Sequence, residues 1–445
     1  MVASRNSKPP ELRIPDAVAG VLATAGVRPA QSVCVALSGG VDSTVLLHAL
    51  ACLRGALRFE LSAAHVHHGL SPNADAWLEF CRQQCALLDI PHHAFHVEVA
   101  RDHPGGLEAA ARDARHTALA EVRCDWLALG HQLDDQAETL LFRLLRGTGV
   151  RGAGAMAPVE RGWPGRLRPL LGLWRSDIVA YAEAFGLAWV EDESNEDPRF
   201  SRNLIRHQVM PPISRAFPGA VPALARASEN FREADGLLGE LAAIDRAACG
   251  GHPMSLAPLL ALSDERVRNL LRWQIREMGL EAPARVRLVE VARQLREAAE
   301  RPLCLSLGGV ACCAYRGQVW LEPEIADDPS AAVQPWRGEA ELAWNGGFVR
   351  FEPVMGAGLG RAALMAAGEV ALCARWKGLS LRQGYGRPSR TFKNLCQEAS
   401  IPAWLRPRLP VLRVDGRAGW IAEIGVAAEL ACGPGEEGLL PVWRR

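Results

Sequence analysis

The sequence predicts an α/β protein in which a doubly wound parallel sheet is followed by a mainly helical domain and a small α+β domain. From Ser32 to about Leu145, short apolar strands alternate with segments of helical period, as expected for parallel strands joined by helices. From about 220 to 300 the pattern is helical, and near Pro302 it changes to short strands. For a chain of 445 residues we therefore expect three domains, at 1–215, 216–330 and 331–445.

The elements expected in the first domain follow from this alternation. Strands are expected at 33–37, 60–66, 93–99 and 125–129, and helices at 44–52, 74–88, 107–121 and 134–145. Later in the chain, strands are expected at 304–307 and 318–321, a linker at 323–338, and a helix at 391–399. The first ten residues are expected to form a disordered tail.

Composition sets limits on the class of protein. Apolar residues make up 49% and charged residues 22%, and there is neither a run of about 18 apolar residues nor the apolar core of a signal peptide. We expect a cytoplasmic protein with no membrane segment. The twelve cysteines include no C-x-x-C pair, so we expect free thiols and no disulfide framework or zinc site.

A glycine-rich loop carries the strongest chemical signal. The motif Ser38-Gly39-Gly40-Val41-Asp42-Ser43 lies between an expected strand and an expected helix. Glycines let the backbone approach phosphate oxygens, and N–H groups at a helix N-terminus point at an anion. No Gly-Lys-Ser/Thr follows, so this is not a Walker loop. It is better suited to holding pyrophosphate while chemistry takes place at an α-phosphate.

A carboxylate cluster follows the fourth strand, in Gly130-His131-Gln132-Leu133-Asp134-Asp135-Gln136-Ala137-Glu138-Thr139. Asp134, Asp135 and Glu138 fall within one helical turn, where like charges repel one another unless a cation is present. Mg²⁺ or the ammonium group of a lysine would supply that cation. The alternative is that the two aspartates only favour the helix N-terminus.

Two further motifs sit at expected strand and helix boundaries. His65 and His67, in His65-Val66-His67-His68-Gly69-Leu70-Ser71, lie near a strand end that faces the ligand crevice of an open sheet. Nucleotide contact or structural hydrogen bonding is favoured over a metal site there. Arg112 and Arg115 share one face of a helix and could hold phosphate, or pair with Glu108 at the surface.

The first motif resembles the signature S-G-G-x-D-S of the PP-loop ATP pyrophosphatase family. Members of that family use ATP to adenylate an oxygen atom and release pyrophosphate. The resemblance implies that Ser38 to Ser43 bind ATP, with His65, His67, Gly130 and His131 nearby, and that Asp42 and Asp135 hold Mg²⁺.

Further motifs resemble the tRNA(Ile)-lysidine synthetase family over about residues 30–210. They are H-V-x-H-G-L-S, G-x-E-A-A-A-R, G-H-x-x-D-D-Q-A-E-T, R-P-L-L at 168–171 and D-x-S-N-x-D-x-x-x-x-R-N at 192–203. Weaker similarity continues through 260–300. Near the C-terminus, the segments Leu381-Arg382-Gln383, Gly386–Leu395 and Ile401–Pro410 resemble the last domain of the longer members.

This resemblance implies a two-step reaction on an isoleucine tRNA with a CAU anticodon. The C2 oxygen of the wobble cytidine attacks the α-phosphate of ATP, and the ε-amine of free L-lysine then displaces AMP. Asp134, Asp135 and Glu138 would hold Mg²⁺ or the lysine ammonium and take a proton, and Arg112 would stabilise charge on phosphate. The resemblance also leaves room for a homodimer, which no sequence feature demands.

Two basic groups are expected to contact tRNA. The first follows an acidic loop and comprises Arg202, Asn203 and Arg206. The second is Arg387, Arg390, Lys393 and Arg406, in a C-terminal segment in which Glu398 alone offsets the positive charges.

Two alternatives remain open at this point. One is another PP-loop enzyme that modifies tRNA, of the thiolase type, although such enzymes commonly carry C-x-x-C. The other is a tRNA-binding module that has kept the fold and lost catalysis.

Overall fold

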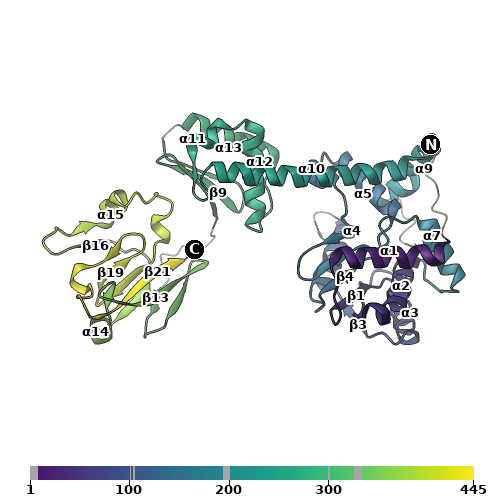
Figure 1. Ribbon diagram of the computed structural model, residues 1–445, viewed down its shortest axis with the longest axis horizontal. Coiled ribbons are helices and arrows are strands. Elements are labelled where there is room, and N and C mark those ends of the chain that lie inside the picture. The colour runs from purple at the N-terminus through teal and green to yellow at the C-terminus, as the bar shows by residue number, and fades with distance from the viewer. Residues whose placement is uncertain are drawn as a thin grey trace. The chain divides into compact units, whose positions relative to one another are not determined.

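The computed structural model describes residues 9–100, 102–103, 106–193, 201–298, 301–324 and 333–444, without the side chain of Glu108. The chain divides into two compact units, Met1–Leu238 and Gly239–Arg445 (Figure 1). Most of the expected N-terminal tail, residues 194–200 with part of the acidic loop, and half of the expected linker lie outside the described residues.

A six-stranded sheet forms the centre of the first unit, in the order β3-β2-β1-β4-β6-β5. The strands are β1 (Ser32–Ala36), β2 (Glu60–His67), β3 (His92–His96), β4 (Trp126–Ala128), β5 (Val159–Glu160) and β6 (Gly165–Leu167). All pairs are parallel except β5 with β6. Because β2 and β4 flank β1, the strand order reverses there, and a ligand crevice is expected beyond the carboxyl ends of β1 and β4.

Helices cover both faces of this sheet, which confirms the doubly wound α/β class. On one face lie α1 (Pro10–Ala25), α2 (Val41–Leu57), α3 (Ala74–Leu87) and α7 (Arg175–Ala184). On the other lies α4 (Gly106–Ala120), whose apolar side chains pack on Cys34, Ala64, Val66 and Leu127. The apolar stripe Ile14, Val18, Leu22 and Ala25 holds α1 in the main core.

The remaining helices of the first unit surround the end of β4. They are α5 (Leu133–Leu145), α6 (Val150–Ala153), α8 (Ser201–Leu204), the π-helix η2 (Ile205–Val209) and α9 (Met210–Ala216). The long helix α10 (Ala220–Ala248) begins here and extends past Leu238. Leu133 and Ala137 of α5 pack against Ile205, Met210 and Val221, so α5 and η2 are held side by side.

The second unit starts with a helical part and a small sheet that share one apolar core. Its elements are β7 (Met254–Ser255), α11 (Leu256–Ala261), α12 (Asp264–Glu277), α13 (Arg285–Ala298), β8 (Leu303–Ser306), β9 (Val310–Tyr315) and β10 (Gln318–Pro323). The sheet order is β7-β10-β9-β8.

The rest of the second unit is mostly β-structure around a separate core. One sheet has the order β11-β15-β18-β19-β20, another β12-β13-β21-β14, and β16 pairs with β17. The strands are β11 (Val333–Pro335), β12 (Glu341–Trp344), β13 (Gly347–Met355), β14 (Leu359–Gly360), β15 (Val370–Cys373), β16 (Ser380–Leu381), β17 (Arg390–Thr391), β18 (Val411–Val414), β19 (Arg417–Ile421), β20 (Gly425–Val426) and β21 (Glu437–Arg444). The helices are α14 (Arg361–Ala366), α15 (Phe392–Glu398), and the short 3₁₀ turns η4 (Arg406–Arg408) and η5 (Ala428–Leu430).

Three expectations need correction. The expected linker begins too early and ends too late, because β10 continues to Pro323 and β11 starts at Val333. The expected strand at 93–99 ends at His96. Cys304 and Cys313 are joined by a disulfide because they are directly opposite on β8 and β9, a contact that sequence spacing does not reveal. None of the described helices is long and apolar enough to cross a membrane.

Candidate active site

The glycine-rich loop joins β1 to α2 and is braced by its own hydroxyl groups. The hydroxyls of Ser38 and Ser43 are 3.1 Å apart, and Ser43 donates to the carbonyl of Gly40 at 3.0 Å. Helix α2 begins at Val41 with Gly40 as its N-cap. The first N–H groups of a helix have no partner within it, so those of α2 are available to an anion at the crevice.

Two glycines of the site are required by close packing. Gly39 has φ +88°, and a Cβ there would lie 2.8 Å from Cγ2 of Val190, whose N–H donates to the Gly39 carbonyl at 3.0 Å. A Cβ on Gly130, at the end of β4, would lie 3.1 Å from the backbone of Asp42 and Ser43. Any larger residue at these positions would displace the loop or the start of α2.

The histidines predicted beside ATP have distinct contacts. Nδ1 of the buried His65 is 2.9 Å from the Leu37 carbonyl, so His65 braces the strand end that leads into the loop. Burial lowers the pKa of His65 to about 4, which keeps the ring neutral. His67 contacts Asp75 at 2.9 Å. Desolvation by burial lowers the pKa of His131, beside Gly130, to about 3. ATP contact by any of the three stays a prediction.

Helix α5 carries the predicted carboxylates, and its N-terminus is capped by side chains. Gln132 is the N-cap, and its Oε1 accepts from the Asp134 N–H at 2.6 Å. Asp135 Oδ2 accepts from the Gln132 N–H at 3.1 Å, so Asp135 does have the helix-start role that the alternative interpretation gave it. Asp134 Oδ2 instead accepts from the N–H of Arg175, at the start of α7, at 3.3 Å. Burial raises the pKa of Asp134.

The structure supplies cations to this cluster from its own chain. Arg206 of η2 donates to Glu138 twice at 2.9 Å and to Asp135 Oδ1 at 2.9 Å. Arg202 of α8 donates to Asp135 Oδ1 at 3.2 Å and lies 3.6 Å from Glu138. The premise that only a bound cation would relieve the repulsion is therefore wrong for Asp135 and Glu138. Arg202 and Arg206 were predicted to contact tRNA, and that role stays a prediction.

The carboxyl group of Asp42 is partly buried at the start of α2 and lies near the carboxylates of α5. Its Oδ1 has no hydrogen-bond partner among the described residues, and Oδ2 lies 3.8 Å from the Arg175 guanidinium. Burial, and then the negative charge of Asp135, raise the pKa of Asp42 to about 7. An orphaned carboxylate oxygen in a negative environment is suited to a cation.

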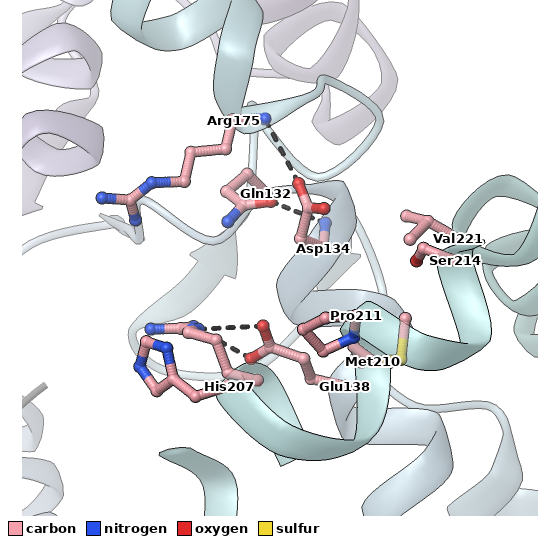
Figure 2. Close-up of a pocket in the computed structure, with 10 residues that line it drawn as sticks. Gln132, Asp134, Glu138, Arg175, His207, Met210, Pro211, Ser214 and Val221 are labelled. Carbon is pink, nitrogen blue, oxygen red and sulfur yellow. Dashed lines mark hydrogen bonds and ion pairs between the residues drawn. The ribbon is translucent and has the colours of Figure 1, made fainter. Parts of the chain in front are cut away.

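A cavity of about 410 Å³ lies next to these groups. Asp134 and Glu138 line it together with Arg175 and Arg206, and Val221 and Ser214 lie across it from Asp134 (Figure 2). The rest of the wall includes Gln132, His207, Met210 and Pro211. Carboxylates and an apolar wall thus share one pocket, a combination that can take an ammonium group on an aliphatic chain.

Sequence reasoning missed much of this pocket. Arg175, His207, Met210, Ser214 and Val221 lie between 37 and 83 positions after Glu138 and belong to no motif that points to chemistry. The apolar residues of α9 and α10 look like ordinary core positions in the sequence. Asn203, predicted to contact tRNA, is buried on α8. Arg112, on α4, is exposed.

The C-terminal basic residues fall into two kinds. Arg387, Arg390 and Lys393 are exposed, with Arg390 3.1 Å from Glu398. Arg406 is partly buried and donates to the Ile401 carbonyl at 3.1 and 3.0 Å, so part of its role is structural. Glu429 also lies 3.4 Å from Arg382, so Glu398 is not the sole offsetting charge. The exposed Tyr385 lies two positions before Arg387, and the sequence analysis did not predict a role for it.

Family models match three separate stretches of the chain. Residues 14–213 match the PP-loop domain, 254–320 the TilS substrate binding domain, and 370–443 the TilS substrate C-terminal domain. Among solved structures, a U34-tRNA thiolase from Methanococcus maripaludis is 20% identical, with a TM-score of 0.41, over 50% of this chain and 80% of its own.

Curated relatives match over nearly the whole chain. The tRNA(Ile)-lysidine synthase of Aromatoleum aromaticum is 67% identical over 425 residues, which cover 96% of this chain and 100% of that protein. The enzyme of the same name from Azoarcus sp. (strain BH72) is 52% identical, over 96% of this chain and 94% of its own. The one from Pseudomonas aeruginosa is 42% identical, over 85% and 86%. At these identities and coverages, the chain belongs to the tRNA(Ile)-lysidine synthase family.

Proposed function

We propose that this protein joins free L-lysine to C2 of the wobble cytidine in an isoleucine tRNA with a CAU anticodon, with ATP converted to AMP and pyrophosphate. The cytosine O2 attacks the α-phosphate, and pyrophosphate leaves. The ε-amine of lysine then attacks C2, the bond from C2 to oxygen breaks, and AMP leaves with that oxygen. One observation carries the proposal: the glycine-rich loop before α2 and a carboxylate-lined pocket lie beside each other in a chain of this family.

ATP would bind at the loop between β1 and α2. The N-terminus of α2 offers N–H donors and a positive helix end to the phosphates, and Ser38 and Ser43 add hydroxyls. Because the loop is braced before ATP arrives, little reorganisation is needed when charge develops at the α-phosphate. Arg112 on α4 and Arg202 on α8 are further candidates to stabilise that charge.

Asp42 fits a Mg²⁺ ion better than the other carboxylates do. Its Oδ1 lacks a partner among the described residues, whereas Asp135 already accepts from the Gln132 N–H and two arginines. Within the described ranges, no group of three or more His, Cys, Asp or Glu side chains forms a ready metal site. This agrees with an ion bound by one or two carboxylates plus phosphate oxygens, whose chemistry would be to neutralise phosphate charge. Asp135 would be the second carboxylate, with the ion displacing Arg202 or Arg206 from its Oδ1.

Lysine would occupy the pocket beside α5. Its ammonium group would lie between Asp134 and Glu138, and its methylene chain would pack on Met210, Pro211 and Val221. The ε-amine must lose a proton before it attacks, and the raised pKa of Asp134 makes this carboxylate a better base than an exposed aspartate. The incoming ammonium would also replace or join Arg206 at Glu138.

The tRNA would be held at several sites along the chain. Arg387, Arg390 and Lys393 form an exposed basic group near Tyr385, which suits phosphate contact and base stacking. A wobble base in a loop can leave its stack at low cost to reach ATP.

We also propose the division into domains at 1–215, 216–330 and 331–445, which the separate apolar cores support.

Nucleoside mass analysis tests the proposal. Purified protein would be incubated with unmodified tRNA, ATP, Mg²⁺ and isotopically labelled lysine. We expect a cytidine heavier by one dehydrated lysine, together with AMP and pyrophosphate. ATP cleavage without lysine incorporation would favour another acceptor, such as that of a thiolase, and no ATP cleavage with tRNA bound would favour a binding module.

A further inference from the structure

The turn between α6 and β5 is held by side chains from two helices. The turn consists of residues 154–156, which follow the short helix α6, and Ala155 has the left-handed φ of 48°. Arg143 of α5 donates to the carbonyls of Gly152 and Ala155 at 3.0 and 2.9 Å. Arg232 of α10 donates to those of Gly154 and Met156 at 2.6 and 2.9 Å. The turn therefore joins α5 to α10.

Gln136 completes this connection on α5. Its Nε2 donates to the Met156 carbonyl at 2.9 Å, and its Oε1 accepts from the Met156 N–H at 3.0 Å. Both residues are buried, so these bonds are shielded from water. Gln136 directly follows Asp134 and Asp135 and precedes Glu138 by two positions. A shift of Met156 would therefore be transmitted to the carboxylates that line the pocket.

Arg232 is held in place by close packing against the turn. A Cβ on Gly154 would lie 2.7 Å from Arg232 Cγ and 3.6 Å from its Cα, so α10 passes against the turn at the closest distance that glycine allows. One nitrogen of Arg232 serves both carbonyls. Its removal would leave Gly154 without this donor and Met156 with Gln136 alone.

We infer that Arg232 is a positioning residue, which sets the lysine-binding carboxylates of α5 through Met156 and Gln136. The inference rests on the proposed function, since it takes the pocket beside α5 as the lysine site. Arg232 thereby connects helix α10 to the pocket through the turn before β5. ATP binds elsewhere in the proposed site, on a loop that Arg232 does not contact.

Steady-state kinetics of lysidine formation tests this inference. For Arg232→Met we expect the KM for lysine to rise at least fivefold, while the KM for ATP changes less than twofold. Arg232→Lys, which keeps a donor near both carbonyls, should reverse at least half of the rise in the KM for lysine. Arg226→Met is the matched control, because Arg226 is exposed on the same helix, and it should leave both KM values unchanged.

Several results would overturn the inference. An unchanged KM for lysine in Arg232→Met would show that the contacts of Arg232 do not position the carboxylates of α5. Equal rises for lysine and ATP, or no recovery in Arg232→Lys, would indicate a general structural role. If Arg232→Met does not fold, Gly154→Ala carries the same expectation by pushing on Arg232, and loss of folding there too would also count as a structural role. A wild-type protein that forms no lysidine would refute the proposed function itself, and this inference with it.

Discussion

The carboxyl group of Asp42 gives a testable pH dependence at the scale of one residue. Burial and the charge of Asp135 raise its pKa to about 7, so the folded protein binds this proton more tightly than the unfolded chain does. Asp42 therefore contributes stability at low pH, and this is lost as the pH rises from about 4 through 7. We expect Asp42→Asn to be increasingly more stable than wild type over that range, by up to about 4 kcal/mol at pH 8. Urea unfolding at several pH values without nucleotide measures the difference, and a constant difference would contradict the assignment.

The ion pairs of Arg206 give a second prediction at this scale. Glu138 is almost fully buried, and Arg206 is its closest cation. Because removing one partner leaves a buried charge poorly compensated, we expect Arg206→Met to lower the free energy of unfolding by about 3 kcal/mol. Arg215→Met on the neighbouring helix α9 replaces an exposed arginine and should change stability by less than about 0.5 kcal/mol. Equal effects of both changes in urea unfolding would show that the ion pairs contribute little.

The sequence predicts the parts of the site whose residues are close together in the chain, and it does not predict contacts between distant residues. Ser38 to Ser43 and the carboxylates of α5 were predicted as groups because each lies within a few positions of the next. The pairing of Arg206 with Glu138 was not, because the two residues are 68 positions apart and either is compatible with a surface location. The capping bond of Asp135 was foreseen only as an alternative, since helix starts and active sites use the same residue types.

At the scale of elements, the regular alternation of strands and helices predicts the central sheet. The prolines near the N-terminus hide the helix that packs on it. Strands β1, β2 and β4 and helices α2 to α5 were expected near their observed positions. Helix α1 was missed although its buried residues recur every three or four positions, because Pro9, Pro10 and Pro15 resemble breakers. Pro10 stands at the first helical position, where its missing N–H costs nothing. The antiparallel strand β5 has two residues and no periodic pattern to detect.

The loop before α2 provides a prediction about an element. Gly39→Ala would force a Cβ into Val190 at a φ that disfavours alanine, so the loop must move away from its phosphate-binding shape. We expect the KM for ATP to rise at least tenfold, while Gly55→Ala, in the last turn of α2 where an added Cβ meets no other atom within 4 Å, leaves it unchanged. Initial rates at varied ATP concentration separate the two variants. An unaltered KM in Gly39→Ala would mean that this loop does not hold the nucleotide.

At the scale of the whole molecule, the net charge of zero conceals a local basic surface. Each phosphate contact that is lost should make binding of tRNA less dependent on salt. We expect the double variant Arg387→Ala, Lys393→Ala to bind tRNA more weakly and to lower the slope of log affinity against log salt by about 2. Arg417→Ala, which removes another exposed charge of the same domain, should keep the slope. A slope that the double variant does not change would assign tRNA binding to other residues.

In the proposed mechanism, one site divides the two half-reactions between the loop before α2 and the carboxylates of α5. Glu138 separates them best, because Asp134 and Asp135 also act on Asp42. The most direct measurement is a single turnover of Glu138→Gln with tRNA, lysine and ATP labelled at both the α- and γ-phosphates. We expect that pyrophosphate is released and adenylated tRNA accumulates, with little AMP and little lysidine. Release of AMP and lysidine at the wild-type rate, or no release of pyrophosphate, would contradict it.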